Sequence, residues 1–219
     1  LCECGNATFT AVATGTGITY QWQENTGSGY SDIGGATSAS FTKMATTTAM
    51  NGYLYRVIVS GTCPAPVTSS GVLLSVNALP AITTQPLAVT ACAGENAVYT
   101  VVASGTGLSY QWQEDAGAGF ANLPGETNAT LTRTAVTAGM NGYLYRVIVS
   151  GTCSPSVTSV GVSLTVQTSP SISTQPASAT VCAGQNATYT VVATGTFLTY
   201  QWQENTGSGF VDIVGATNP

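Results

Sequence analysis

The sequence Tyr20-Gln-Trp-Gln-Glu24 decides the fold of this chain, and it recurs at residues 110–114 and 200–204. The tryptophans of the three copies lie 90 residues apart, at Trp22, Trp112 and Trp202. In a β-strand, residues two positions apart share a face, so Tyr and Trp point one way and the two Gln side chains point the other way. A strand that buries Tyr and Trp and exposes Gln is typical of one half of a β-sandwich core. We therefore predict about two and a half copies of one β-domain, with the three tryptophans in the cores.

The 90-residue period places the predicted unit boundaries at residues 1–78, 79–168 and 169–219. The first unit lacks an opening strand, and the second is complete. The third keeps its opening strand, a strand around Tyr189 and the Trp strand with its return, but it has no counterpart of residues 143–150. Half a sandwich exposes an apolar face and unpaired strand edges. We expect either that the sequence is a window from a longer array, which is the preferred interpretation, or that a neighbouring chain completes the broken unit.

Composition excludes several classes of function. Charged residues make up only 6% of the 219 residues and the net charge is −5, so the chain lacks the clustered Lys and Arg that nucleic-acid binding requires. No apolar run approaches the ~20 residues of a membrane-spanning helix, so no membrane insertion is expected. Because His is absent and no Cys-x-x-Cys pair occurs, the sequence argues against zinc sites of mixed Cys and His and against a Ser-His-Asp triad. We expect no metal and no cofactor.

Two carboxylate pairs offer the remaining catalytic possibility. Glu24 with Asp32, and Glu204 with Asp212, flank the hairpin loop that follows the Trp strand, whereas the second copy has Asn122 in place of the aspartate. Such a pair could bind Ca²⁺ weakly or serve as acid and base. We interpret these side chains as solvated hairpin charges and predict that the protein is not an enzyme.

The second unit carries motifs that resemble the skeleton of an immunoglobulin-like (Ig-like) domain. They are Gly-Glu-Asn-Ala-Val-Tyr-Thr-Val at residues 94–101, then Trp112, then Asn-Gly-Tyr-Leu-Tyr-Arg-Val at residues 141–147. In such domains a Tyr lies two residues before the second core Cys, and Tyr55 and Tyr145 match it. The resemblance implies an all-β fold of tandem Ig-like β-sandwiches, about 90 residues per repeat, with both tyrosines in the core.

The two core cysteines of that skeleton are replaced here by apolar residues, Val101 with Val147 and Ala11 with Val57. More narrowly, Val-Cys-Ala-Gly-Gln-Asn-Ala-Thr-Tyr at residues 181–189 resembles the Ig-like repeats of large secreted or cell-surface bacterial proteins of the adhesin or filament type. This resemblance implies an extracellular or cell-surface location, and it carries over no catalytic residue.

Disulfide candidates are the six cysteines, Cys2, Cys4, Cys63, Cys92, Cys153 and Cys182. Repeated cysteines in a β-chain of low charge indicate an oxidising setting. In the topology that the resemblance implies, cysteines in the phases of Cys2 and Cys63 lie at opposite poles of one unit, on the order of 50 Å apart if the strands are extended. The resemblance then implies that Cys2 (or Cys4) pairs with Cys153 across the joint between units.

By the same rule, Cys92 pairs with a cysteine in the missing part of the third unit, and Cys63 pairs with a preceding domain. The alternative is a bond within one unit, such as Cys92 with Cys153.

Two functions fit these observations. Residues 50–63 are identical to residues 140–153, and residues 19–29 are identical to residues 199–209. Identical copies add length, which favours a structural segment of a bacterial filament, stalk or adhesin shaft that associates with itself or with neighbouring repeats. The alternative is an Ig-like recognition module that binds a glycan, a surface ligand or a protein through loops such as 25–29 and 61–66.

Overall fold

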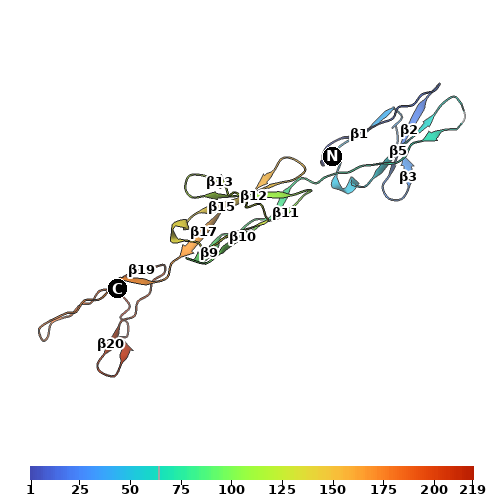
Figure 1. Ribbon diagram of the computed structural model, residues 1–219. Coiled ribbons are helices and arrows are strands. Elements are labelled where there is room, and N and C mark those ends of the chain that lie inside the picture. Colours follow the sequence, from blue (N-terminus) through green and yellow to red (C-terminus); the bar gives the residue numbers. More distant parts are fainter. Residues whose placement is uncertain (64) are drawn as a thin grey trace.

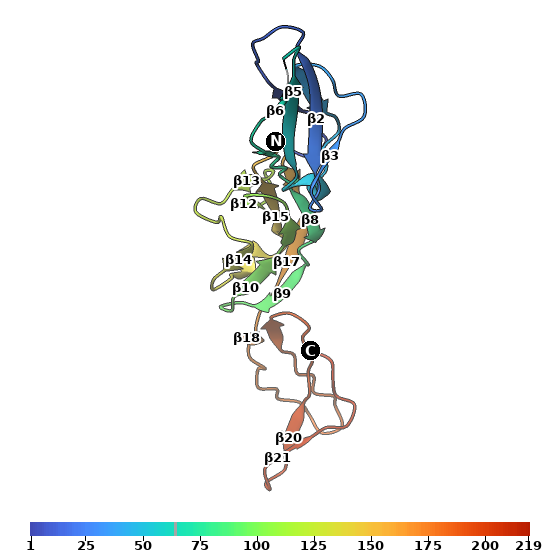
Figure 2. The same cartoon turned by 90° about the vertical axis from the view of Figure 1, so that its right-hand side faces the viewer.

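The computed structural model describes residues 1–63 and 65–219. Two β-sandwiches and a more open C-terminal segment follow one another along a single long axis (Figures 1 and 2). The N-terminus lies at the end of the first sandwich that faces the second, not at its outer tip (Figure 1). No helix in the described residues is long and apolar enough to cross a membrane.

The first sandwich has two sheets and one 3-10 turn. Its elements are β1 (Ala7–Thr10), β2 (Thr19–Asn25), β3 (Tyr30–Asp32), β4 (Ser40–Lys43), η1 (Thr48–Met50), β5 (Leu54–Ser60), β6 (Val67–Thr68) and β7 (Val72–Leu73). One sheet pairs β1 with β4, and the other has the order β3-β2-β5-β6, with β7 also on β5.

The second sandwich repeats this plan and adds the opening strands. Its elements are β8 (Ala81–Thr84), β9 (Val89–Cys92), β10 (Ala97–Thr100), β11 (Val102–Ser104), β12 (Ser109–Asp115), β13 (Ala121–Asn122), β14 (Thr130–Arg133), η2 (Ala138–Met140), β15 (Leu144–Ser150), β16 (Val157–Thr158) and β17 (Val162–Gln167). Its main sheet has the order β13-β12-β15-β17-β9, with β16 on β15, while β10 pairs with β14 and β11 with β8. Strand β9 runs parallel to β17 and all the other pairs are antiparallel. This is an Ig-like sandwich.

The core of the second sandwich is centred on the Trp strand. Trp112, Tyr145 and Val147 are completely buried, and Val101 is 2% exposed. Valines therefore fill the two places where the Ig skeleton has its cysteine bridge. The Trp112 Nε1–H donates to the carbonyl of Asn128 at 2.9 Å, so the buried indole keeps a hydrogen bond.

The first sandwich has the same arrangement with a smaller core. Tyr55 is completely buried and Trp22 is 4% exposed. Trp22 pairs with Val57 across the sheet, as Trp112 pairs with Val147. The ring of Phe9 stacks on that of Tyr55, with centroids 4.6 Å apart.

The C-terminal segment is less complete than the sequence predicts. Its strands are β18 (Ser171–Thr174), β19 (Val192–Thr194), β20 (Gln203–Asn205) and β21 (Phe210–Asp212). The predicted strand around Tyr189 does not form, and the predicted Trp strand is reduced to β20, which leaves Trp202 partly exposed. The reason lies in pairing: in the second sandwich, β10 pairs with β14 and β12 with β15. This sequence holds no third copy of β14 or β15, whereas β18–β19 and β20–β21 keep both partners.

Candidate functional site at the joint between the sandwiches

A disulfide joins the two sandwiches. Cys2 precedes β1 in the first sandwich, and Cys153 lies in the loop after β15 in the second. Their Cα atoms are 5.6 Å apart and 151 residues separate them in the sequence. Cys153 is only 2% exposed. The pairing that the resemblance implied is therefore confirmed, and the alternative bond between Cys92 and Cys153 is wrong.

Backbone pairing brings Cys2 to this joint. Cys2 forms a parallel β-bridge with Asn77, which lies at the end of the first sandwich. The Asn77 N–H donates to the carbonyl of Leu1 at 2.7 Å, and the Glu3 N–H donates to the carbonyl of Asn77 at 3.0 Å. The beginning and the end of the first sandwich thus lie together at the pole that faces the second.

The second sandwich contributes two loops. The Thr152 N–H donates to the carbonyl of Thr106 at 2.8 Å, which places Cys153 next to the loop between β11 and β12. The hydroxyl of Thr106 in turn accepts a hydrogen bond from the Ala78 N–H at 2.9 Å. One carboxylate oxygen of Glu3 accepts from the Leu79 N–H at 2.9 Å. One residue of each sandwich, Glu3 and Thr106, therefore accepts a hydrogen bond from the linker beside the disulfide.

Gly105 allows the linker between the two sandwiches to lie close to the loop between β11 and β12. Its φ is +142°, and a Cβ atom there would lie 2.9 Å from the Cα of Pro80 and 3.0 Å from the carbonyl oxygen of Leu79. Real Cβ atoms essentially never show the first distance, and the second is tighter than nine in ten real Cβ contacts. Gly195 has the same φ and the same close approach to Pro170 and Ser169, so the second joint is built in the same way.

The second joint repeats the hydrogen bonds without a disulfide. The Thr168 N–H donates to the hydroxyl of Thr196 at 3.0 Å, as Ala78 does to Thr106. Cys92 pairs with Gln167 in parallel register, as Cys2 does with Asn77. The Cys92 thiol is exposed and unbonded.

The remaining cysteines are also exposed and unbonded: Cys4, Cys63 and Cys182. Cys4 has φ +64° and occupies the position that Gly94 and Gly184 take in the later copies. Cys63 lies in the loop 61–66, which the sequence suggested as a recognition loop and which includes Pro64, outside the described residues. The other suggested loop, 25–29, is closed by Asn25, whose Oδ1 accepts from the backbone N–H groups of Gly27 and Gly29.

The two carboxylates of each candidate pair lie on opposite faces of the sheet. Asp32 is opposite Gln23 in the strand register, and Glu24 is opposite Ser31. Asp32 accepts a hydrogen bond from Gln23 at 2.7 Å, whereas Glu24 accepts one from Lys43 at 3.0 Å. Alternation along the strand therefore separates the two groups. Within residues 1–63 and 65–219, no cluster of three or more His, Cys, Asp and Glu side chains could hold a metal.

Sequence reasoning missed a polar network at the edge of the core. The Tyr145 hydroxyl donates to Glu114 at 2.8 Å, and Arg133 forms an ion pair with the same carboxylate at 3.1 Å. Tyr55, Glu24 and Lys43 repeat it in the first sandwich. Burial, with the adjacent glutamate, raises the pKa of Tyr55 and Tyr145 above the ordinary value. The exchange of Lys43 for Arg133 at one position was the only signal in the sequence.

Tyr99 gives a first prediction. Its side chain is 1% exposed and its hydroxyl has no hydrogen-bond partner in the described residues, while Phe9 occupies the same position in the first sandwich. An unpaired buried hydroxyl costs about 1–3 kcal/mol. We expect Tyr99→Phe to raise the free energy of unfolding by about 1 kcal/mol, measured by urea titration. A loss of stability would mean that the hydroxyl has a partner in solution.

Alkaline pH should weaken the second sandwich. Burial raises the pKa of Tyr99 to about 12 from its ordinary value of 10.0. Between these two pH values the folded chain keeps a proton that the unfolded chain has lost, so the free energy of unfolding falls as pH rises. We expect stability to be constant up to about pH 10 and to decline from there to about pH 12. In urea titrations across this range, Tyr99→Phe should show a shallower decline than the wild type, and equal slopes would contradict the assignment.

The comparisons with known proteins agree with this repeat structure. A family model described as a domain of unknown function, DUF8696, matches residues 1–78 and again residues 82–168. The chain belongs to the DUF8696 family. Each of the two sandwiches corresponds to one DUF8696 match, and the disulfide Cys2–Cys153 links the two.

Among curated proteins, Endoglucanase C of Cellulomonas fimi is 36% identical to the DUF8696 chain over 118 residues. That match covers 53% of this chain and 10% of the endoglucanase, so the chain spans about a tenth of the relative's length.

Solved structures share the fold. An I-band fragment of titin is similar with a TM-score of 0.68 and 15% identity, over 96% of this chain and 76% of the titin chain. The crystal structure of the first two Ig domains of DIP-gamma is similar with a TM-score of 0.55 and 14% identity, over 76% of this chain and 91% of that chain. At these identities the likeness establishes tandem Ig-like domains and no specific activity.

Proposed function

We propose that this DUF8696 chain is a segment of an extracellular bacterial shaft, stalk or filament, in which Ig-like units at a regular period are linked end to end. The observation that carries the proposal is the position of the disulfide: it bridges two consecutive units and crosses their joint. In Ig domains the cysteine bridge usually lies inside the sandwich, where Val101 and Val147 are buried here. A bond at the joint fixes the angle between units, which serves a rod and adds little to a ligand site.

Three further observations support this role. The fourteen residues 50–63 are repeated without change at 140–153, including the cysteine that the joint uses. Disulfides persist in oxidising compartments, which agrees with a secreted or cell-surface protein. The part of Endoglucanase C that matches is only a tenth of that enzyme, consistent with a non-catalytic unit that recurs in larger proteins.

Small-angle X-ray scattering of the whole chain tests the proposal. We expect the oxidised wild type to scatter as one rigid elongated particle. Cys153→Ser should keep both sandwiches folded, as judged by circular dichroism, but show a broader distribution of particle lengths because the joint can bend. Cys92→Ser is the matched control and should scatter as the wild type does. If Cys153→Ser is as rigid as the wild type, the disulfide does not set the shape.

Recognition of a glycan or a protein partner is the alternative function. Structures of this fold include a complex of Dpr11 with DIP-gamma. A chain of that complex is 15% identical to this chain, with a TM-score of 0.50. Binding by this chain would depend on surface loops such as 25–29 and would not depend on the disulfide. Saturable binding of a glycan or cell-surface protein that survives Cys153→Ser but not changes in loop 25–29 would favour this alternative.

A further inference from the structure

The turn that carries Cys2 has the same form in all three copies. The Gly5 N–H donates to the carbonyl of Cys2 at 3.2 Å, which closes a four-residue turn over residues 2–5. The same hydrogen bond closes the turns that begin at Cys92 and Cys182, at 3.0 Å in each. The three turns therefore allow a comparison of one position, the third residue, on the same backbone.

Only the first copy has a cysteine at this third position. Gly94 and Gly184 have φ values of +92° and +83°, in the region that glycine adopts without steric cost. Cys4 keeps this left-handed backbone, with φ +64°, although a side chain is disfavoured there. The Cys4 side chain is exposed, as is Gly94 in the second sandwich. A solvent-accessible thiol thus stands where the backbone favours glycine, two residues from a cysteine that forms a disulfide.

Cys4 is near enough to Cys2 in the chain to pair with it. Residues two positions apart in a tight turn have Cα atoms roughly 5–7 Å apart, because consecutive Cα atoms are about 3.8 Å apart. A disulfide needs Cα atoms roughly 4.4–6.8 Å apart, so the turn suits a bond that spans Glu3 alone. Cys153 is separated from Cys2 by 151 positions, and it comes within reach only after the second sandwich has folded and docked on the first.

The two possible partners of Cys2 differ in their access to solvent. Cys153 is 2% exposed, in a joint where the linker forms hydrogen bonds with both sandwiches. Cys4 is open to solvent. Thiol–disulfide exchange depends on access to the sulfur atoms. A small-molecule disulfide therefore reaches the Cys4 thiol more readily than the Cys153 thiol.

We propose that Cys4 is the temporary disulfide partner of Cys2 while the joint assembles. A small-molecule disulfide first oxidises the Cys2 and Cys4 thiols to a Cys2–Cys4 disulfide and is itself reduced to two thiols. When the second sandwich docks, the Cys153 thiol loses its proton to water and the thiolate attacks the Cys2 sulfur. The Cys2–Cys4 bond breaks, and Cys4 leaves as a thiolate that takes a proton from water. This second step is balanced without a further oxidant, and the proposal does not depend on the shaft function.

The structure favours this direction of exchange. The bond that it contains is the product, Cys2–Cys153, with a free thiol on Cys4. The leaving Cys4 thiolate forms at an exposed position, where water stabilises its charge. The Cys2–Cys153 bond also forms together with the hydrogen bonds of the linker, whereas a Cys2–Cys4 bond constrains only the turn.

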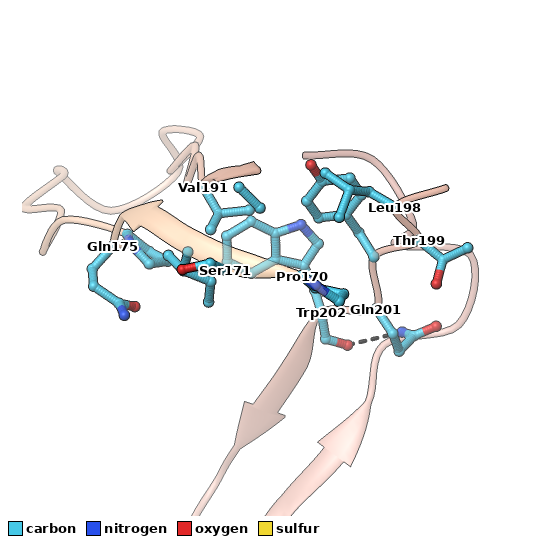
Figure 3. Close-up of a pocket in the computed structure, with 12 residues that line it drawn as sticks. Pro170, Ser171, Gln175, Val191, Leu198, Thr199, Gln201 and Trp202 are labelled. Atoms are coloured by element: carbon cyan, nitrogen blue, oxygen red, sulfur yellow. Dashed lines mark hydrogen bonds between the residues drawn. The ribbon is translucent and has the colours of Figure 1, made fainter. Parts of the chain in front are cut away.

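The turn at the second joint has no second cysteine. Cys92 is followed two residues later by Gly94, and the Cys92 thiol is exposed and unbonded. On the other side of this joint, the described residues that line the pocket around Trp202 include no cysteine, and Figure 3 shows Pro170 and Leu198 among them. The proposal therefore concerns the first joint alone, and Cys92 provides a thiol in the same turn without a neighbouring cysteine.

Oxidation of the reduced whole chain tests the proposal. After the reductant is removed, a low concentration of oxidised glutathione is added, free thiols are trapped with a maleimide at successive times, and pepsin fragments are analysed by mass spectrometry. The N-terminal peptide with Cys2 and Cys4 carries two labels before oxidation, none as the Cys2–Cys4 disulfide, and one when Cys2 is linked to the Cys153 peptide. We expect the unlabelled peptide to appear first and to disappear at the rate at which the linked peptide forms.

Cys4→Gly is the decisive variant, because glycine is the residue of the other two turns. It should form the Cys2–Cys153 bond about tenfold more slowly, since no neighbouring thiol at millimolar effective concentration captures the oxidised sulfur of Cys2. Cys182→Ser is the control and should match the wild type. In Cys153→Ser the Cys2–Cys4 disulfide should persist as the final product, while Cys92 keeps a bound glutathione. Equal rates in Cys4→Gly and the wild type, or a Cys153→Ser chain in which Cys2 and Cys4 stay unlinked, would overturn the proposal.

Discussion

Replacing Trp112 by alanine should remove about 3–5 kcal/mol from the free energy of unfolding of the second sandwich. Trp112 is completely buried, packs near Tyr99 at a ring-centroid distance of 6.3 Å, and donates its indole N–H to Asn128. Truncation leaves a cavity and an unpaired carbonyl in a unit whose total stability is of order 5–15 kcal/mol. Urea titration of the oxidised chain, followed by near-ultraviolet circular dichroism, measures the loss.

Trp202→Ala is the matched control for this experiment. Both tryptophans lie in the same sequence, Tyr-Gln-Trp-Gln-Glu, but Trp202 is only half-buried. We therefore expect a smaller loss from Trp202→Ala than from Trp112→Ala, because part of the Trp202 side chain is already in contact with water. Equal costs at the two positions would show that the C-terminal segment closes its core in solution.

This contrast also explains how far the sequence predicts the structure. Strand β12 was predicted from the alternation of Tyr110 and Trp112, and the same alternation at Tyr200 and Trp202 gave only β20. The alternation of apolar and polar residues predicts which face of a strand is apolar. The strand itself forms only when a second strand pairs with it. The 90-residue period predicted the two sandwiches because their partners recur within the same copy.

The joint was predicted in part. The phase of the cysteines within the Ig topology gave the pair Cys2 and Cys153, since strand direction alone decides which pole each cysteine occupies. The hydrogen bonds of Glu3 and Thr106 to the linker could not be predicted, because they depend on the close approach that Gly105 allows. The resemblance left Cys4 open as the partner of Cys153, whereas the structure assigns the bond to Cys2 and leaves Cys4 exposed, with φ +64°.

Pulling on the two ends of the oxidised chain should not extend residues 3–152. Force that enters at Leu1 reaches Cys2, crosses the disulfide to Cys153 and continues along the chain, because the bond joins residues whose Cα atoms are 5.6 Å apart. The whole first sandwich and the strands of the second up to β15 lie outside this path. Single-molecule force spectroscopy with attachment at residues 1 and 219 measures the lengths that are released.

After reduction of the disulfide, unfolding of residues 3–152 under load should release about 500 Å, the length of roughly 150 extended residues at ~3.4 Å each. Cys153→Ser should show the same release without reductant, and Cys92→Ser should behave as the oxidised wild type. If the oxidised wild type shows an extension step equal to the unfolded length of the first sandwich, the load does not pass through the disulfide. In a shaft under tension, a bond placed at the joint shields the whole first sandwich and strands β8 to β15 of the second. A cysteine bridge at the positions of Val101 and Val147 would shield only residues within the second sandwich.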